Sequence, residues 1–358
     1  MHKARPLSRY RDKGLFNTNE RKIIMAYATL IISLAIILAG AEIFTNGIEW
    51  LGKKLNLGEG AVGSILAAVG TALPETMIPV IAILFGSGED STHIGIGAIL
   101  GAPFMLATLA MMVTGGAALL FKTNGIRRRF MLCDINIIKR DLSFFIIVYA
   151  VALAAAFLPS HDYKIYVAIF LVSAYAFYAY RTIRSGQSLG ASELPPLMFN
   201  KSIPNPSLFW VVFQVFFALV VIVLGANIFV NAITSISTSL GIPAFILAII
   251  IAPIATELPE KFNSVVWIKQ GKDTLALGNI TGAMVFQSSL IPAIGILLTP
   301  WKLSPLALIS GALALTSATI ILFSIRFKKK LVPSTLIGVG FFYIIFLLIV
   351  VFSGGNLH

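Results

Sequence analysis

Thr71-Ala72-Leu73-Pro74-Glu75 lies inside one apolar stretch of the chain, and Thr256-Glu257-Leu258-Pro259-Glu260 lies inside another, 185 residues later. A carboxylate near the middle of a bilayer costs about 3 kcal/mol to insert, so two carboxylates in matching places indicate a function. The proline before each glutamate has no N–H, which leaves the carbonyl oxygens of Gly70 and Ala255 without their helical donor. A bare carbonyl oxygen, a threonine hydroxyl and a carboxylate together favour a cation site.

The composition around these stretches is that of a membrane protein. Of the 358 residues, 58% are hydrophobic and 12% are charged, and the mean hydropathy is +0.91, which lies far outside the range of a soluble domain. The 27 Lys and Arg outnumber the 15 Asp and Glu, but in such a chain basic residues mark cytoplasmic loops, so we expect no nucleic-acid partner. With Cys133 as its single cysteine, the chain has no intrachain disulfide and no cysteine-based metal cluster. We expect no cofactor.

Apolar runs separated by charged or Gly-, Pro- and Ser-rich segments predict ten transmembrane helices. Their approximate limits are 24–50, 60–85, 94–121, 142–158, 164–181, 208–236, 243–268, 274–298, 303–325 and 332–352. A segment rich in Pro, Ser and Asn separates the fifth run from the sixth and is typical of a linker. The predicted organisation is a basic N-terminal tail (1–23), a first half (24–181), the linker (182–207), a second half (208–352) and a C-terminal tail (353–358).

The two halves repeat one sequence pattern. Residues 40–75 align without a gap on residues 225–260, with 13 identities in 36 positions. Further on, a Gly-x-x-x-Gly pair at 97–101 matches one at 278–282, and such pairs are typical of closely packed helices. Because each half has five spans, the second half must enter the membrane in the opposite orientation. The sequence therefore predicts an all-α polytopic membrane protein with ten transmembrane helices in two inverted five-helix repeats, and a substrate site at the midplane where the proline-interrupted second and seventh helices meet.

The charge of the loops predicts the orientation of these helices. With the N-terminus outside, five inside loops carry most of the Lys and Arg, whereas the outside loops between spans carry only Lys164 and Lys302. The basic N-terminal tail is the one segment that contradicts this assignment. We expect an integral protein of the plasma membrane with both termini outside.

Glu75 and Glu260 would face each other across the pseudo-twofold axis of an inverted repeat. Together with the hydroxyls of Thr71 and Thr256 and the freed carbonyls, they supply about six oxygens, which suits a hard cation such as Ca²⁺. Alternatively, each glutamate satisfies a neighbouring polar group or lines a water-filled crevice without binding an ion.

Two further polar positions have open alternatives. Glu257 has no acidic counterpart in the first half, and Lys261 follows one helical turn later. The two form an ion pair that lets the helix insert, or Lys261 competes with a bound cation. Asn46 lies one turn after Glu42 and serves either to join helices or to support the ion site.

These motifs resemble the two α-repeats of the cation/Ca²⁺ exchanger superfamily, which includes the sodium/calcium exchangers. The resemblance rests on Gly40-Ala41-Glu42 with residues 70–75, repeated as Gly225-Ala226-Asn227 with residues 255–260, and it covers about residues 24–352. It implies a secondary antiporter rather than an enzyme, which exchanges Ca²⁺ or another divalent cation for Na⁺ or H⁺. The ligands that it implies are Thr71, Glu75, Thr256 and Glu260.

The chain departs from the family pattern on the third predicted helix. Ala98, Ala102 and Leu106 stand where the family has polar ligands, whereas Asn279 and Gln287 keep oxygen donors on the eighth helix. Fewer oxygens leave fewer sodium sites, which favours the hypothesis that protons on the glutamate pair replace the counter-ion. Outside this class, a non-transporting receptor or scaffold with the same fold is the alternative.

Overall fold

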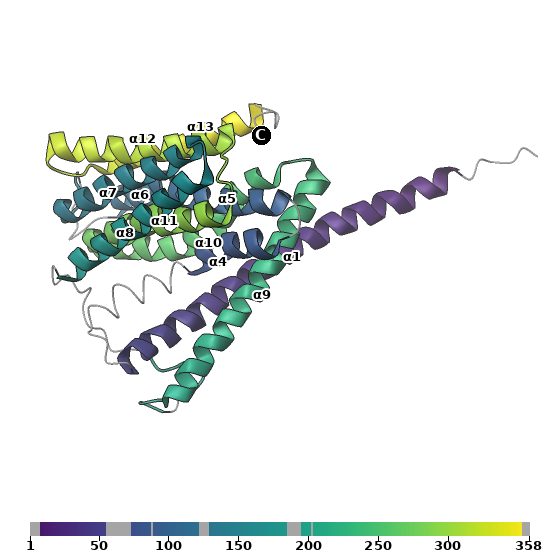
Figure 1. Cartoon of the computed structure of the whole chain (residues 1–358), viewed down its shortest axis with the longest axis horizontal. Helices are drawn as coiled ribbons and strands as arrows, with labels where there is room; N and C mark the ends of the chain where they lie inside the picture. The colour runs from purple at the N-terminus through teal and green to yellow at the C-terminus, as the bar shows by residue number, and fades with distance from the viewer. Residues whose placement is uncertain are drawn as a thin grey trace, which may run out of the picture.

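The computed structural model describes residues 8–54, 73–86, 89–121, 129–184, 195–201 and 203–352, and the following structural statements concern these residues (Figure 1). Within them every regular element is a helix. The elements are α1 (Ser8–Lys54), α4 (Leu73–Phe85), α5 (Glu89–Met105), the π-helix η2 (Leu106–Ala110), α6 (Met111–Leu120), α7 (Ile135–Ala154), the 3₁₀-helix η3 (Ala155–Phe157), α8 (His161–Arg184), α9 (Leu208–Leu240), α10 (Ala244–Lys269), α11 (Asp273–Leu298), α12 (Pro305–Lys328) and α13 (Pro333–Phe352).

Eight helical runs in the described ranges are long and apolar enough to cross a bilayer. Two shorter apolar helices, Glu75–Phe85 and Ala244–Ile254, belong to the second and seventh predicted spans. The structure therefore confirms an all-helical, multi-pass membrane protein, while the full set of ten helices stays a prediction. α1 begins at Ser8, before the apolar part of the helix at Ile23–Lys54, because a long helix extends at little cost into adjoining polar residues.

α1 and α9 lie side by side and cross the other helices at an angle (Figure 1). Their contact is reciprocal: a Cβ on Gly40 would lie 2.8 Å from Cγ1 of Ile222, and a Cβ on Gly225 would lie 2.8 Å from Cγ1 of Ile37. Both glycines and both isoleucines are separated by 185 residues in the sequence. A local twofold axis produces this kind of exchange, so the contact supports the predicted inverted repeat.

The linker from Pro195 onward connects α1 to α9 through hydrogen bonds. Trp50 Nε1 donates a hydrogen bond to the carbonyl of Pro195 at 2.9 Å, and Asn46 Nδ2 donates to that of Pro196 at 3.3 Å. Gln214 of α9 donates in turn to Asn46 Oδ1 at 2.9 Å. Of the two roles considered for Asn46, the structure supports the joining of helices.

α5 and α10 approach each other closely at the first glycine pair. A Cβ on Gly97 would lie 2.8 Å from the carbonyl oxygen of Phe245, and one on Gly101 would clash with the carbonyl oxygen of Ile249. The close packing predicted for this pair is therefore confirmed. For Gly278 and Gly282 no described atom lies within 4 Å of such a Cβ. By the repeat, these glycines would pack against residues 60–64, which are outside the described residues. Close packing at the second pair therefore stays a prediction.

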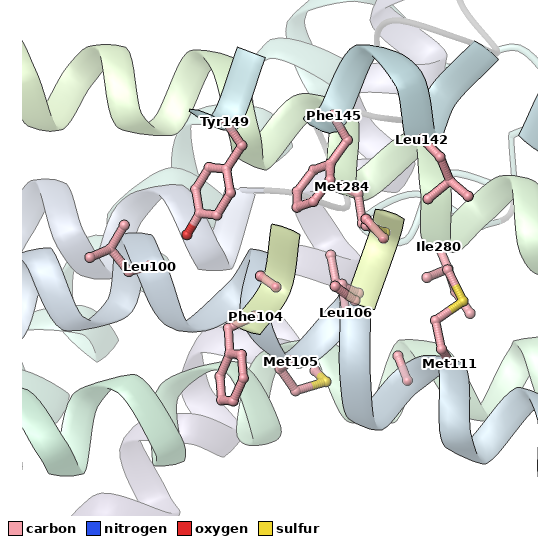
Figure 2. Close-up of a cluster of buried hydrophobic side chains, with 14 of the residues drawn as sticks. Leu100, Phe104, Met105, Leu106, Met111, Leu142, Phe145, Tyr149, Ile280 and Met284 are labelled. Atoms are coloured by element: carbon pink, nitrogen blue, oxygen red, sulfur yellow. The ribbon is translucent and has the colours of Figure 1, made fainter. Parts of the chain in front are cut away.

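The main hydrophobic core lies between α5, η2, α6, α7 and α11 (Figure 2). Phe104, Leu106, Phe145 and Met284 converge in it from these helices, all fully buried. The π-turn frees a carbonyl of the helix backbone, and Ser317 Oγ of α12 donates to the carbonyl of Ala107 within that turn. The third predicted span therefore contains a satisfied polar group in the core.

The connecting segments fall into two groups by their contacts. Leu132 N donates to Asp273 Oδ2 at 2.7 Å, and Met131 N donates to the carbonyl of Leu331 at 2.9 Å, so the α6–α7, α10–α11 and α12–α13 connections lie together. By contrast, Lys164 at the start of α8 donates to carbonyl oxygens of the α11–α12 connection. These are the same two groups that the loop charges assign to opposite sides of the membrane.

Gly101→Ala should separate α5 from α10. Alanine favours an unhindered helix by about 1 kcal/mol over glycine, but here the methyl group meets a backbone carbonyl, so we expect a loss of about 1–3 kcal/mol. The measurement is the thermal unfolding of the purified protein in detergent. Gly116→Ala on α6 is the control, because a Cβ there meets no described atom within 4 Å. Equal stability of the two variants would contradict the close contact.

Cys133 should react slowly. Burial raises the pKa of its thiol to about 12, and the charges of Asp273 and Asp134 add to the shift. Because the thiolate is the reactive form, alkylation by iodoacetamide at pH 8 should be at least about a hundredfold slower than for an ordinary cysteine. Unfolding in detergent such as SDS should restore the ordinary rate, whereas equal rates before and after unfolding would refute the half-buried position.

Candidate functional site

Glu75 occupies a buried position on α4, with 6% of its surface exposed. α4 contacts both α10 and α11, the helices that carry the polar residues of the second half. The first-half glutamate therefore lies on the helix that adjoins the second-half motif, as the repeat predicts. Its predicted neighbours Gly70 and Thr71 lie outside the described residues.

Glu257 is the best-defined acidic group of the second half. It lies on α10 with 1% of its surface exposed, and Gln287 Nε2 of α11 donates a hydrogen bond to its Oε1. An amide donor lowers the cost of keeping a carboxylate among apolar helices. The partner that we considered, Lys261, and the second glutamate, Glu260, have side chains outside the described set.

Gln287 also offers an acceptor. Its Oε1 is buried and has no hydrogen-bond partner in the described part of the chain. Because its nitrogen is held by Glu257, the carbonyl oxygen is fixed on the opposite side of the amide group. A bound cation would satisfy that oxygen.

α10 passes through the motif as one helix. The prediction that proline interrupts this span was wrong, because α10 runs without a break from Ala244 to Lys269 through Pro253 and Pro259. A proline in a membrane helix removes one hydrogen bond, and neighbouring groups can make up for the loss. Thr256 Oγ1 donates to the carbonyl of Ala252 at 3.0 Å, which leaves its lone pairs for another partner. That the carbonyl of Ala255 is available to an ion stays a prediction.

The two helices beside the motif differ in polarity. α11 presents Asn279, which is half-buried, and the buried Gln287. α5 and the adjoining η2 present the buried side chains of Ala98, Ala102 and Leu106, none of which carries an oxygen. The asymmetry seen in the sequence is thus present in the folded chain, where α5 provides an apolar wall.

A buried ionic cluster that the sequence did not reveal holds α11 from its other side. Asp141 of α7 accepts hydrogen bonds from Tyr178 at 2.7 Å, from Arg140 at 3.0 Å and from Thr281 of α11 at 2.7 Å. In the sequence, Asp141 lies next to Arg140 at the edge of a predicted span, where a charged residue is typical of a loop. The cluster ties α7 and α8 to α11, the helix that positions Gln287.

In the described ranges no group of three or more His, Cys, Asp or Glu is arranged to hold a metal ion. Glu75, Glu257 and Gln287 come from three helices in contact with one another. The complete set of predicted ligands includes residues beyond the described ranges, so the composition of the cation site stays a proposal.

A double-mutant cycle should detect the bond between Glu257 and Gln287. Gln287→Leu leaves a buried carboxylate without its donor and should cost about 1–3 kcal/mol. Combined with Glu257→Gln, the loss should fall short of the sum of the single losses by about 0.5–3 kcal/mol. Thermal unfolding provides the measurement, and Ser289→Ala is the control on the same helix because its hydroxyl donates to carbonyls of its own helix. Strict additivity would contradict the bond.

Comparison with known proteins places this fold and motif in a family. The sequence pattern of the family described as "Sodium/calcium exchanger protein" matches residues 25–184 and 210–354. The putative antiporter CaxA of Alkalimonas amylolytica is 22% identical and aligns over 86% of this chain and 92% of its own length. The sodium/calcium exchanger MaX1 of Methanosarcina acetivorans is 23% identical, over 80% and 87% respectively.

Solved structures agree on the fold. The crystal structure of the H⁺/Ca²⁺ exchanger CAX superposes with a TM-score of 0.70 at 15% identity and covers 96% of this chain and 93% of its own. A structure of the sodium-calcium exchanger NCX_Mj superposes with a TM-score of 0.54 at 18% identity, over 91% and 98%. At these identities the likeness concerns the fold alone, but the family pattern covers most of the chain. The chain therefore belongs to the sodium/calcium exchanger protein family.

Proposed function

We propose that this protein is a secondary active cation antiporter that exchanges Ca²⁺ or another divalent cation for Na⁺, by alternating access at a midplane site between two inverted five-helix halves. The observation that carries the proposal is the burial of Glu75 and Glu257, with Gln287 bound to Glu257, on three mutually contacting helices. Membership of the exchanger family supports it. Buried acidic groups within membrane spans are costly and mark ion pathways.

Glu75 and Glu260 are the proposed central ligands. Two carboxylates balance the charge of one divalent cation, and they can equally be neutralised by two monovalent ions in turn, which is the requirement for exchange at one site. Thr71, Thr256 and the carbonyls of Gly70 and Ala255 complete the oxygen set. On the second side, Glu257, Asn279 and Gln287 add oxygens, and Glu257 raises the negative charge.

The α1–α9 pair is the proposed moving body. The two helices pack reciprocally through Gly40 and Gly225 and are joined by the linker segment that binds Asn46 and Trp50. A pair held together at both of these places can shift as a unit across the remaining helices, which hold the ion site. The loop charges predict both termini on the outer side of a plasma membrane.

The apolar wall of α5 favours H⁺ as a second candidate for the counter-ion. A sodium ion needs several oxygen ligands, whereas a proton needs only the carboxylates. Ala98, Ala102 and Leu106 provide no oxygen on that side of the site. Facing carboxylates in a low dielectric share protons readily, so the same glutamate pair serves either counter-ion.

Flux in proteoliposomes tests the proposal. Uptake of radioactive Ca²⁺ should respond to an outward Na⁺ gradient or to a pH gradient, and the gradient that drives it identifies the counter-ion. Glu75→Gln and Glu260→Gln should each reduce the initial rate by at least about tenfold, since each removes a charged ligand. Asp162→Asn, in an exposed first turn of α8, is the control carboxylate and should retain the rate.

Three results would contradict this account. Flux of Ca²⁺, Mn²⁺ or Mg²⁺ that neither gradient alters would exclude exchange for Na⁺ or H⁺, and no flux above that of protein-free liposomes would leave a non-transporting receptor or scaffold. Full transport in both glutamate variants would place the ion site elsewhere in the chain.

A further inference from the structure

A basic pocket lies at the end of the molecule where α11 ends and α8 begins. Its volume is about 400 Å³, and its lining includes His161 and Lys164 of α8 and Thr299 and Lys302 of the α11–α12 connection. The end of α11 at Leu298 is eleven residues beyond Gln287, or about 16 Å along a helix. The pocket is therefore separate from the proposed cation site, and nothing in the exchange cycle uses it.

Lys164 is the feature that needs an explanation. Only 6% of its surface is exposed, and its Nζ donates to the carbonyl of Pro300 at 2.8 Å and to that of Trp301 at 3.4 Å. Both acceptors are neutral, and within the described residues no carboxylate forms a salt bridge with it. A buried ammonium with only neutral partners is costly, so this position suits a bound negative charge.

Other hydrogen-bond donors share the pocket. Lys302 and His161 line it as exposed side chains, and its lining contains no Asp or Glu. Lys164 and Lys302 are also the two basic residues that the loop charges assign to the outside loops between spans, and the fold brings both to one place. Like charges at close quarters repel one another, and an anion between them removes that repulsion.

The other wall of the pocket is apolar. Leu297 and Leu298 line it with 48% and 39% of their surfaces exposed, at the end of a candidate membrane span. Phe157 and Tyr163 are exposed on either side of the adjoining α7–α8 connection, and aromatic side chains are common at the level of lipid headgroups. The pocket thus joins a basic wall to a surface that acyl chains would cover.

We propose that this pocket binds a phosphate group, carried by an anionic membrane phospholipid or free in solution. The phosphate oxygens accept from the remaining donor of Lys164, from Lys302 and from His161. In the lipid-bound form the acyl chains lie along Leu297 and Leu298, which a free phosphate would leave uncovered. The site stands independently of the proposed exchange function.

Ligand-dependent stability of the delipidated protein in neutral detergent tests the site. Phosphatidylglycerol, phosphatidylcholine and inorganic phosphate are added separately at constant ionic strength. Phosphatidylglycerol should raise the unfolding midpoint by about 2 °C at tenfold excess over its dissociation constant, and phosphatidylcholine should raise it less. A shift by inorganic phosphate instead would identify the free anion as the ligand.

Substitutions test whether the rise in unfolding midpoint comes from binding in this pocket. Lys302→Gln changes an exposed side chain and should fold normally while weakening the shift, and Lys164→Gln with Lys302→Gln should abolish it. Lys272→Gln, an exposed lysine at the opposite end of α11, is the matched control and should keep the full shift. Native mass spectrometry of the lipid retained by Lys302→Gln and Lys272→Gln gives a second reading that does not depend on stability.

Three results would overturn the proposal. The first is that none of the three additives changes the unfolding midpoint. The second is that the zwitterionic and the anionic lipid raise the midpoint equally. The third is that the anionic lipid raises the midpoint equally in the wild-type protein and in the Lys302→Gln variant. The first would show that no phosphate binds, and the second that net negative charge is not recognised. The third would place the binding outside this pocket.

Discussion

The hydrogen bond between Gln287 and Glu257 shows the constraint on which this membrane fold depends: a buried carboxylate among apolar helices needs a donor. Gln287 lies on α11, which Asp141 holds from its other side through Thr281. Two acidic groups of different helices thus each accept a hydrogen bond from one helix. α11 is therefore the element that positions the polar centre, and the hydrophobic core around Phe104 and Met284 surrounds it (Figure 2).

Packing divides the molecule into a part that holds the polar residues and a part suited to move. Gly97 and Gly101 bring α5 against the backbone of α10, which leaves no space for a side chain between them. The α1–α9 pair is instead joined mainly to itself, across Gly40 and Gly225, and crosses the bundle at an angle (Figure 1). This combination of tight backbone contact and a self-contained helix pair is the arrangement on which the proposed alternating access rests.

Much of this arrangement could be predicted from the sequence because hydropathy and repetition act over whole helices. The span limits, the matching Gly40 and Gly225 and the apolar third span all follow from patterns of residue type. The continuity of α10 did not, since proline removes a hydrogen bond in any helix, but only tertiary contacts decide whether the helix breaks. Asp141 was missed for a similar reason: a carboxylate at the edge of a span has the same appearance whether it faces water or three hydrogen-bond donors of the protein. The partner of Glu257 lies 30 residues away on another helix, a distance at which sequence spacing carries no information.

The most direct test of the central claim is the position of a bound ion. A crystal structure of the protein with Ca²⁺, recorded at a wavelength where calcium scatters anomalously, should contain a peak within about 2.6 Å of carboxylate oxygens from both Glu75 and Glu260. A peak whose ligands include neither glutamate, or a saturated crystal with no peak between α4 and α10, would contradict the account.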